Sequence, residues 1–167
     1  MRKLLLLKTI IDILWIISMP ILLIILFIIP YIFLSDDYSS IPIKINENTI
    51  SHIDFISKGV LSIMASSTLL VLYCIYLFKK VLLLFSQRRM FDDSVLINLN
   101  KIGEILIWFS IINIIGSFIY NLNLNKVSFE ISISPLILTL SLGLFFMVLS
   151  EIFKIAKDTK EENDLTV

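Results

Sequence analysis

The chain has 167 residues, of which 57 % are hydrophobic and only 17 % are charged. Soluble domains average about 45–50 % apolar and about 25 % charged residues, so this composition argues against a soluble monomer and against disorder over most of the length. The 14 basic residues balance the 14 acidic ones, so direct nucleic-acid binding is not expected, and a single cysteine, Cys74, excludes an intramolecular disulfide and a cysteine-cluster metal site.

Four apolar blocks follow one another along the chain. A bilayer hydrocarbon core of about 30 Å needs about 20 apolar helical residues to cross it. The blocks cover about 10–34, 59–78, 102–120 and 135–153. We therefore expect an all-α integral membrane protein, a single membrane domain over 1–167 with four transmembrane helices, in which 154–167 forms a short polar tail.

The first block follows Arg2, Lys3 and Lys8, as the apolar part of a secretory signal peptide would. Its length of roughly 25 residues exceeds the usual 7–15, and no small-residue cleavage site follows it, so we expect an uncleaved span. Pro20 and Pro30 lie inside this block, and we expect them to bend the helix.

The first and third connections carry β-branched and aromatic residues at every second position. These residues are Ile41, Ile43 and Ile45 in the first connection, and Phe129, Ile131 and Ile133 in the third. Such alternation is typical of strands, but each connection alone is too short for a stable sheet. Two alternatives stay open: a small extracytoplasmic β element in which the two loops pair, or irregular loops.

The second connection predicts a tight helical elbow at the lipid headgroups. Val81, Leu82 and Phe85 continue the apolar stripe of the second helix beyond its span. The run 92–94, Asp-Asp-Ser, offers N-caps for the next helix. Val95, Leu96, Leu99 and Ile102 share one face of that helix.

Basic residues are concentrated in three of the five segments outside the spans. Eleven lie in the N-terminal segment, the elbow and the tail: Arg2, Lys3, Lys8, Lys79, Lys80, Arg88, Arg89, Lys101, Lys154, Lys157 and Lys160. The other two connections hold three: Lys44, Lys58 and Lys126. Because Lys and Arg gather on the cytoplasmic side, both termini and the elbow are expected in the cytoplasm.

Three carboxylates lie inside the spans near their expected cytoplasmic ends: Asp12, Glu104 and Glu151. A charge inside a bilayer is costly and marks a candidate functional site. One interpretation is a cation or proton site, and the other is interfacial anchoring of the helices. No histidine or metal-binding motif accompanies the three carboxylates, so neither a metal nor a cofactor is expected.

Polar and small residues on the second and third spans indicate how these helices pack. Asn113 and Ser117 share a face of the third span, and Ser62 and Ser66 share a face of the second. Within a bilayer such residues commonly hydrogen-bond to a neighbouring helix, with a gain of about 0.6–2 kcal/mol. We therefore expect these two faces to lie against each other.

Two segments resemble a bacterial membrane family, catalogued as domain of unknown function 2975. They are the tail, EIFKIAKDTKEENDLTV, and the elbow, MFDDSVLINLNKIG. The family pattern is matched by Glu151, Phe153, Glu162, Leu165, Thr166 and Val167 in the tail, and by Phe91, Leu99, Ile102 and Gly103 at the elbow. The chain departs from that pattern at Val95, Ala156 and Thr159, where Asn, Gly and Leu are usual.

The resemblance implies a four-helix protein of the bacterial cytoplasmic (inner) membrane without an assigned activity. Members are often encoded beside small helix-turn-helix regulators, which suggests such a regulator as a cytoplasmic partner. The resemblance supplies no catalytic, cofactor-binding or metal-binding residue.

Two classes of function remain for such a chain. The first is a non-enzymatic interaction, sensing or regulatory protein whose partner surface lies on the elbow and tail, at Arg88, Arg89, Phe91, Glu162, Leu165 and Val167. The second is a small transporter or ion-conducting oligomer that uses the inner carboxylates. An enzyme is not expected, because the sequence contains no nucleophile-elbow, phosphate-loop or His-Glu metal motif.

The tail carries the most specific expectation. A helix from Lys154 to Asp164 would be about 16 Å long at 1.5 Å per residue. That length is enough to return Leu165 and Val167 to the apolar stripe of the elbow. The acidic residues of the tail would then point towards Arg88 and Arg89 or towards a partner. The alternative, which stays open, is a solvated end that only fixes the topology.

Overall fold

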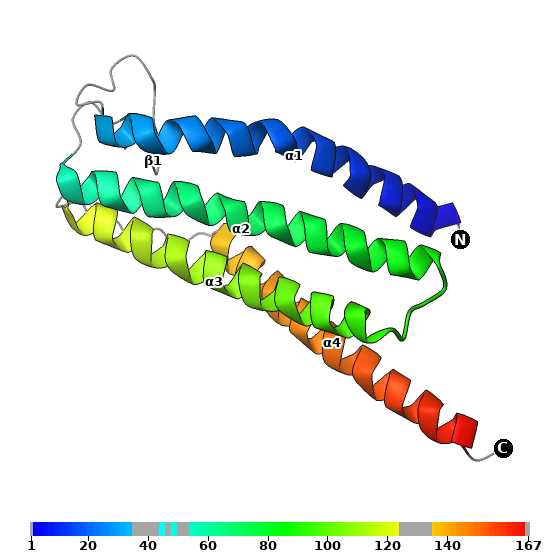
Figure 1. The fold of residues 1–167 in the computed structure, drawn as a ribbon. Helices are drawn as coiled ribbons and strands as arrows, with labels where there is room; N and C mark the ends of the chain where they lie inside the picture. The colour runs from blue at the N-terminus through cyan, green and yellow to red at the C-terminus, as the bar shows by residue number, and fades with distance from the viewer. Residues whose placement is uncertain (1, 35–43, 46–47, 50–53, 124–134, 166–167) are drawn as a thin grey trace.

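The molecule consists of long helices that run back and forth beside one another (Figure 1). The computed structural model describes residues 2–34, 44–45, 48–49, 54–123 and 135–165. Within these ranges the helices are α1 (Arg2–Leu34), α2 (Phe55–Ser86), α3 (Asp93–Asn123) and α4 (Pro135–Leu165). All four described helices are long and apolar enough to cross a membrane, which confirms the four predicted spans.

Each helix extends well beyond its apolar block. The helices have 31 to 33 residues, or roughly 46–50 Å, whereas the hydrocarbon core is about 30 Å thick. Both termini and the α2–α3 turn lie at one end of the molecule, which we call the elbow end (Figure 1). We call the opposite end the loop end. The polar ends of α2, α3 and α4 at the elbow end are therefore continuous with the helices that cross the membrane.

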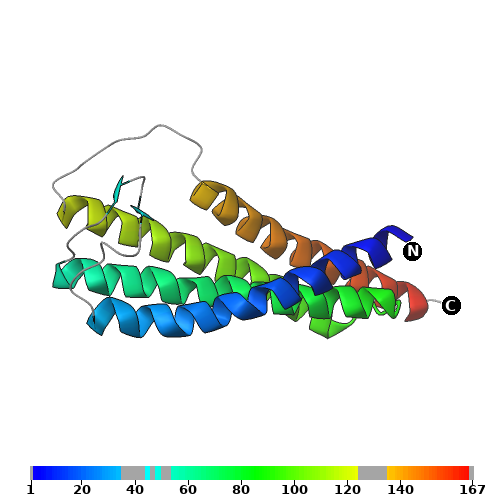
Figure 2. The same cartoon turned by 90° about the horizontal axis from the view of Figure 1, so that it is seen from above.

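Helix α1 is continuous through Pro20 and Pro30. Figures 1 and 2 show that it is curved and that its N-terminal part runs at an angle to α2. A proline ring that clashes with the preceding turn bends a helix in this way, as expected from the sequence.

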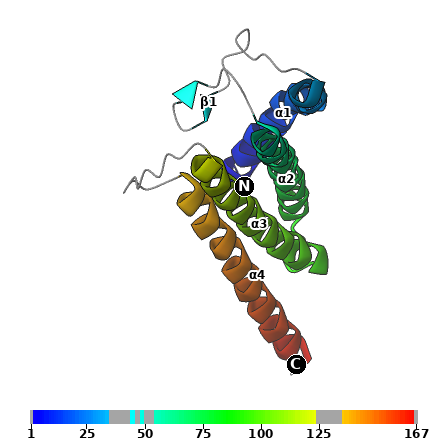
Figure 3. The ribbon, with the colours of Figure 1, turned by 90° about the vertical axis from the view of Figure 1, so that its left-hand side faces the viewer.

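The helices pack in the order of the chain. The backbone of α1 lies against α2, that of α2 against α3, and that of α3 against α4. Viewed along the helices, they form an open row (Figure 3). Side chains also join α2 to α4, because the ring centres of Phe78 and Phe146 are 5.8 Å apart and those of Phe85 and Phe153 are 5.6 Å apart.

The tightest packing surrounds the face of α3 that the sequence predicts. Val95, Leu99 and Ile102 are 0, 1 and 2 % exposed. Towards the elbow end they pack against α2 and α4. At the loop end a separate cluster joins α1, α2 and α3 through Ile32, Val60, Leu61 and Tyr120.

A short antiparallel pair lies within the first loop. Strand β1 (Lys44–Ile45) pairs with β2 (Asn48–Thr49), so that Lys44 is opposite Thr49. The predicted pairing between the two loops involves Ile41, Ile43 and residues 129–133, which lie outside the described residues. That pairing stays a prediction.

Candidate functional site at the elbow and the tail

Helix α2 ends in a Schellman motif. The backbone N–H of Arg88 donates to Phe85 O at 3.1 Å, and that of Arg89 donates to Leu84 O at 3.0 Å. Arg88 has a φ of 61°, in the left-handed region that usually favours glycine. An arginine at this position costs about 1–2 kcal/mol of backbone strain, and its side chain is exposed at the turn.

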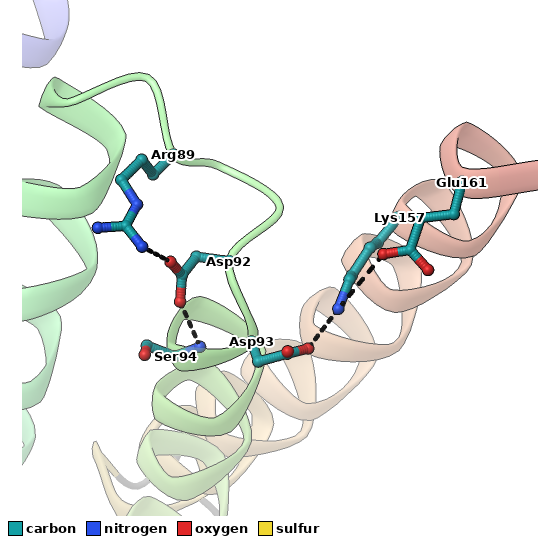
Figure 4. Close-up of polar contacts among 6 residues, drawn as sticks. All are labelled: Arg89, Asp92, Asp93, Ser94, Lys157 and Glu161. Carbon is teal, nitrogen blue, oxygen red and sulfur yellow. Dashed lines mark hydrogen bonds and ion pairs between the residues drawn. The ribbon is translucent and has the colours of Figure 1, made fainter. Parts of the chain in front are cut away.

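Asp92 caps the start of α3, as the sequence predicts. Its carboxylate accepts a hydrogen bond of 2.9 Å from the backbone N–H of Ser94 and pairs with the guanidinium of Arg89 (Figure 4). The bond from Ser94, supported by the charge of Arg89, holds the pKa of Asp92 below its usual value. The turn is therefore fixed by backbone bonds, a cap and an ion pair.

The tail is held against the elbow by two lysines of α4. Lys157 Nζ pairs with the Asp93 carboxylate and lies 3.6 Å from Glu161 Oε1 (Figure 4). The hydrogen bond to Asp93 is the main cause of a raised pKa for Lys157. One turn further along α4, Lys160 Nζ lies 5.4 Å from the ring centre of Phe91, within the range of a cation–π contact.

The predicted docking of the chain end is wrong at Leu165. Its side chain is 86 % exposed and does not return to the elbow, and Val167 lies outside the described residues. The reason is that α4 continues as one helix to Leu165, so the last turn leads away from the elbow (Figure 1). Glu162 is also exposed, and Arg89 pairs with Asp92 rather than with a tail carboxylate.

One side of the tail is slightly hollowed. A shallow depression of about 540 Å³ is lined by Ala156, Thr159, Lys160, Glu162 and Asn163. Glu161, Glu162 and Asp164 are exposed near its far end. The tail thus offers an acidic surface on a helix that the elbow holds in place.

The structure separates the three carboxylates of the spans. Asp12 Oδ1 lies 3.0 Å from Nζ of Lys79 on α2, and Glu104 Oε1 accepts a hydrogen bond of 2.6 Å from Asn100. Glu151 is exposed on α4, at the other end of the row from α1. Within the described ranges, no group of three or more His, Cys, Asp or Glu side chains could hold a metal ion.

Asn113 joins α3 to α2 in the middle of the apolar region. Its Nδ2 donates to Ser67 Oγ at 2.9 Å and to Phe109 O at 2.8 Å, and the side chain is 8 % exposed. At the loop end Asn123 Nδ2 donates to Ser57 Oγ at 3.1 Å. Polar side chains therefore connect these two helices at two levels.

The serine that contacts Asn113 is not one of those predicted. Ser66 is exposed and donates to Ile63 O of its own helix, and Ser62 donates to Lys58 O. The partner is Ser67, since one residue of a helix corresponds to a rotation of about 100° and turns Ser66 away from α3. Ser117 is partly buried on α3.

Sequence reasoning missed the crossing of α3 and α4. A Cβ atom at Gly103 would lie 2.5 Å from Met147 Cγ and 2.7 Å from Gly143 O, and one at Gly143 would lie 2.9 Å from Gly103 O. Glycines inside transmembrane helices allow such close approach of two backbones. Their presence within two apolar blocks was the signal that could have located this contact.

Comparison with known proteins gives one match. A family model described as "Protein of unknown function (DUF2975)" matches residues 21–167, which include the C-terminal part of α1 and all of α2, α3 and α4. No curated protein and no solved structure matches the chain.

Proposed function

The chain belongs to the DUF2975 family, a family described only as proteins of unknown function, and from its geometry we propose that it is a non-enzymatic membrane protein that binds a cytoplasmic protein through its elbow and tail. This role is that of an interaction or regulatory protein. The observation that carries the proposal is the attachment of the tail to the elbow by Lys157 and Lys160.

This attachment gives the tail a defined orientation. The contacts of Lys157 with Asp93 and of Lys160 with Phe91 lie within one turn of α4. They are followed by three exposed carboxylates that we call the acidic tip: Glu161, Glu162 and Asp164. A helix fixed in this way binds a partner with less loss of conformational entropy than a free chain end does. The tip carries exposed carboxylates and is complementary in charge to a basic surface, such as that of a small helix-turn-helix regulator.

The orientation in the membrane is part of the proposal. The excess of basic residues at the elbow end supports placing both termini in the cytoplasm of a bacterial cell. In a Cys74→Ser background, a cysteine introduced at Ser40 should react with an impermeant thiol reagent added to intact cells. A cysteine introduced at Ser86 should react only after the membrane is opened, and the reverse pattern would contradict the orientation.

A charge swap tests whether tail docking supports partner binding. Lys157→Glu places a carboxylate against Asp93 and should release the tail, whereas the double variant Asp93→Lys with Lys157→Glu should restore the pair. We expect crosslinks from a photoreactive residue at Thr159, an exposed position of the tail, to a partner to be lost in the single variant and recovered in the double one. Equal crosslinking in all three proteins would refute a role for docking.

A second variant tests the acidic tip directly. Glu162→Lys with Asp164→Lys should abolish crosslinking to a basic partner without changing the amount of protein in the membrane. The matched control is Asp54→Lys, which reverses an exposed acidic residue at the loop end. If the control reduces crosslinking as much as the tail variant does, the acidic tip is not the binding surface.

A further inference from the structure

A groove of about 290 Å³ lies between the end of α2 and the start of α3. Its lining residues are Lys80, Leu83, Leu84, Ser94, Ile97 and Asn98. None of them belongs to the contacts that hold the tail. The groove is therefore a separate feature of the elbow end.

The lining combines hydrogen-bond donors with exposed apolar side chains. The available donors are the Lys80 ammonium and the Asn98 amide, because the Ser94 hydroxyl already bonds to Asp92. Leu83 is 41 % exposed and Ile97 is 53 % exposed. Such a surface fits the anionic headgroup of a lipid, in which phosphate and hydroxyl oxygens alternate with short carbon segments.

Acidic residues close to the groove are already paired. None of its lining side chains in the described part of the chain is acidic. Asp92 is bound to the N–H of Ser94 and to Arg89, and Asp93 is bound to Lys157. The charge at the groove is therefore dominated by Lys80.

The position of Lys80 along α2 matches the layer of lipid headgroups. The apolar block of α2 ends at Phe78, so Lys80 is about 3 Å beyond the hydrocarbon edge, and each headgroup layer is roughly 5–8 Å thick. Lys80 Nζ lies 5.2 Å from the ring centre of Tyr76, and this ring is 5.5 Å from that of Trp15. Tyr and Trp side chains are enriched at this depth.

We propose that the groove binds the headgroup of an anionic phospholipid, with the phosphate at Lys80 and the rest of the headgroup beyond it, beside Leu83 and Ile97. Asn98 would donate to an oxygen of the headgroup, and the acyl chains would extend from Lys80 towards the apolar block of α2. Basic pockets between helices at a membrane surface bind anionic headgroups in this manner. A soluble phosphate would use Lys80 but would lack the acyl chains that hold a phospholipid in the bilayer.

The test uses the full chain in nanodiscs and in mild detergent. Native mass spectrometry should show that the wild type retains phosphatidylglycerol in preference to phosphatidylcholine of the same chain length. Lys80→Gln should lower that retention about five-fold, the effect expected for one lysine near an anionic surface, and Lys80→Arg should preserve it. Ile97→Glu, which places a carboxylate at an exposed position of the groove, should also lower it.

The matched control is Lys154→Gln, which removes the same charge from an exposed lysine of α4 at the same membrane surface but outside the groove. It should lower retention less than Lys80→Gln does, and an equal loss in both variants would overturn the proposal. Thermal unfolding in phosphatidylcholine alone verifies that the variants are folded. Equal retention of both lipids, or unchanged retention in Lys80→Gln and Ile97→Glu, would overturn the proposal. So would an equal increase in thermal stability on addition of glycerol phosphate, because the ligand would then be a soluble anion.

Discussion

The crossing of α3 and α4 gives the sharpest test of the packing. In Gly103→Ala the new Cβ would lie 2.7 Å from Gly143 O, a backbone atom, whereas ordinary contacts begin at 3.4 Å. The two helices would have to separate by about 0.7 Å, and the side chain of Met147 would also have to move. Overpacking of this kind costs about 1–3 kcal/mol, so we expect Gly103→Ala and Gly143→Ala to lower the free energy of unfolding by that amount.

Gly59 of α2 offers a matched control, because a Cβ atom there would have no atom within 4 Å. Gly59→Ala should raise the free energy of unfolding by about 0.5–1 kcal/mol, the usual gain in a helix. The three variants and the wild type should be unfolded thermally in one detergent and followed by circular dichroism. If Gly103→Ala is as stable as Gly59→Ala, α3 and α4 do not cross at these glycines.

Three further predictions concern single side chains. Asn113→Leu should insert normally but lower the free energy of unfolding in detergent by about 0.6–2 kcal/mol, because the bond to Ser67 is lost; an unchanged value would contradict that bond. Arg88→Gly should raise the free energy of unfolding by up to about 1 kcal/mol, because relief of backbone strain exceeds the entropy cost of glycine. A lower free energy of unfolding would show that contacts of the arginine side chain stabilise the protein by more than the strain costs. Because the pKa of Asp92 is lowered in the folded state, its charged form stabilises the protein above the ordinary value of about 3.9 and this effect is lost below it. In thermal unfolding, the difference in free energy of unfolding between the wild type and Asp92→Asn should therefore shrink as the pH falls below about 3.9.

The helices and their buried faces could be predicted because they depend on local patterns. The lengths of the four apolar blocks predicted the spans, and the spacing of Val95, Leu99 and Ile102 predicted which face of α3 is buried. The run of polar residues at 92–94 likewise located the cap of α3. These features need no knowledge of the neighbouring helix.

Contacts between helices could be predicted only approximately, since they depend on rotation and crossing angle. Asn113 was expected to bond to α2, but the choice between Ser66 and Ser67 depends on a rotation that the sequence does not specify. The pair of Lys157 with Asp93 depends on how far α4 extends before it leaves the elbow. The same uncertainty led to the wrong position for Leu165.

The open row has a consequence for how the protein assembles during synthesis. From α2 onwards, each helix lies against the helix synthesised just before it, so each can pack as soon as it is made and needs no segment that is synthesised later. The contacts of α4 with Phe78 and Phe85 then close the assembly when the last helix arrives. Mechanical force applied at the termini should extract α1 first and leave α2, α3 and α4 together in the membrane. Among the described helices α1 and α4 each lie against one backbone neighbour, but α4 is also held by the glycine crossing with α3 and by the phenylalanine pairs with α2.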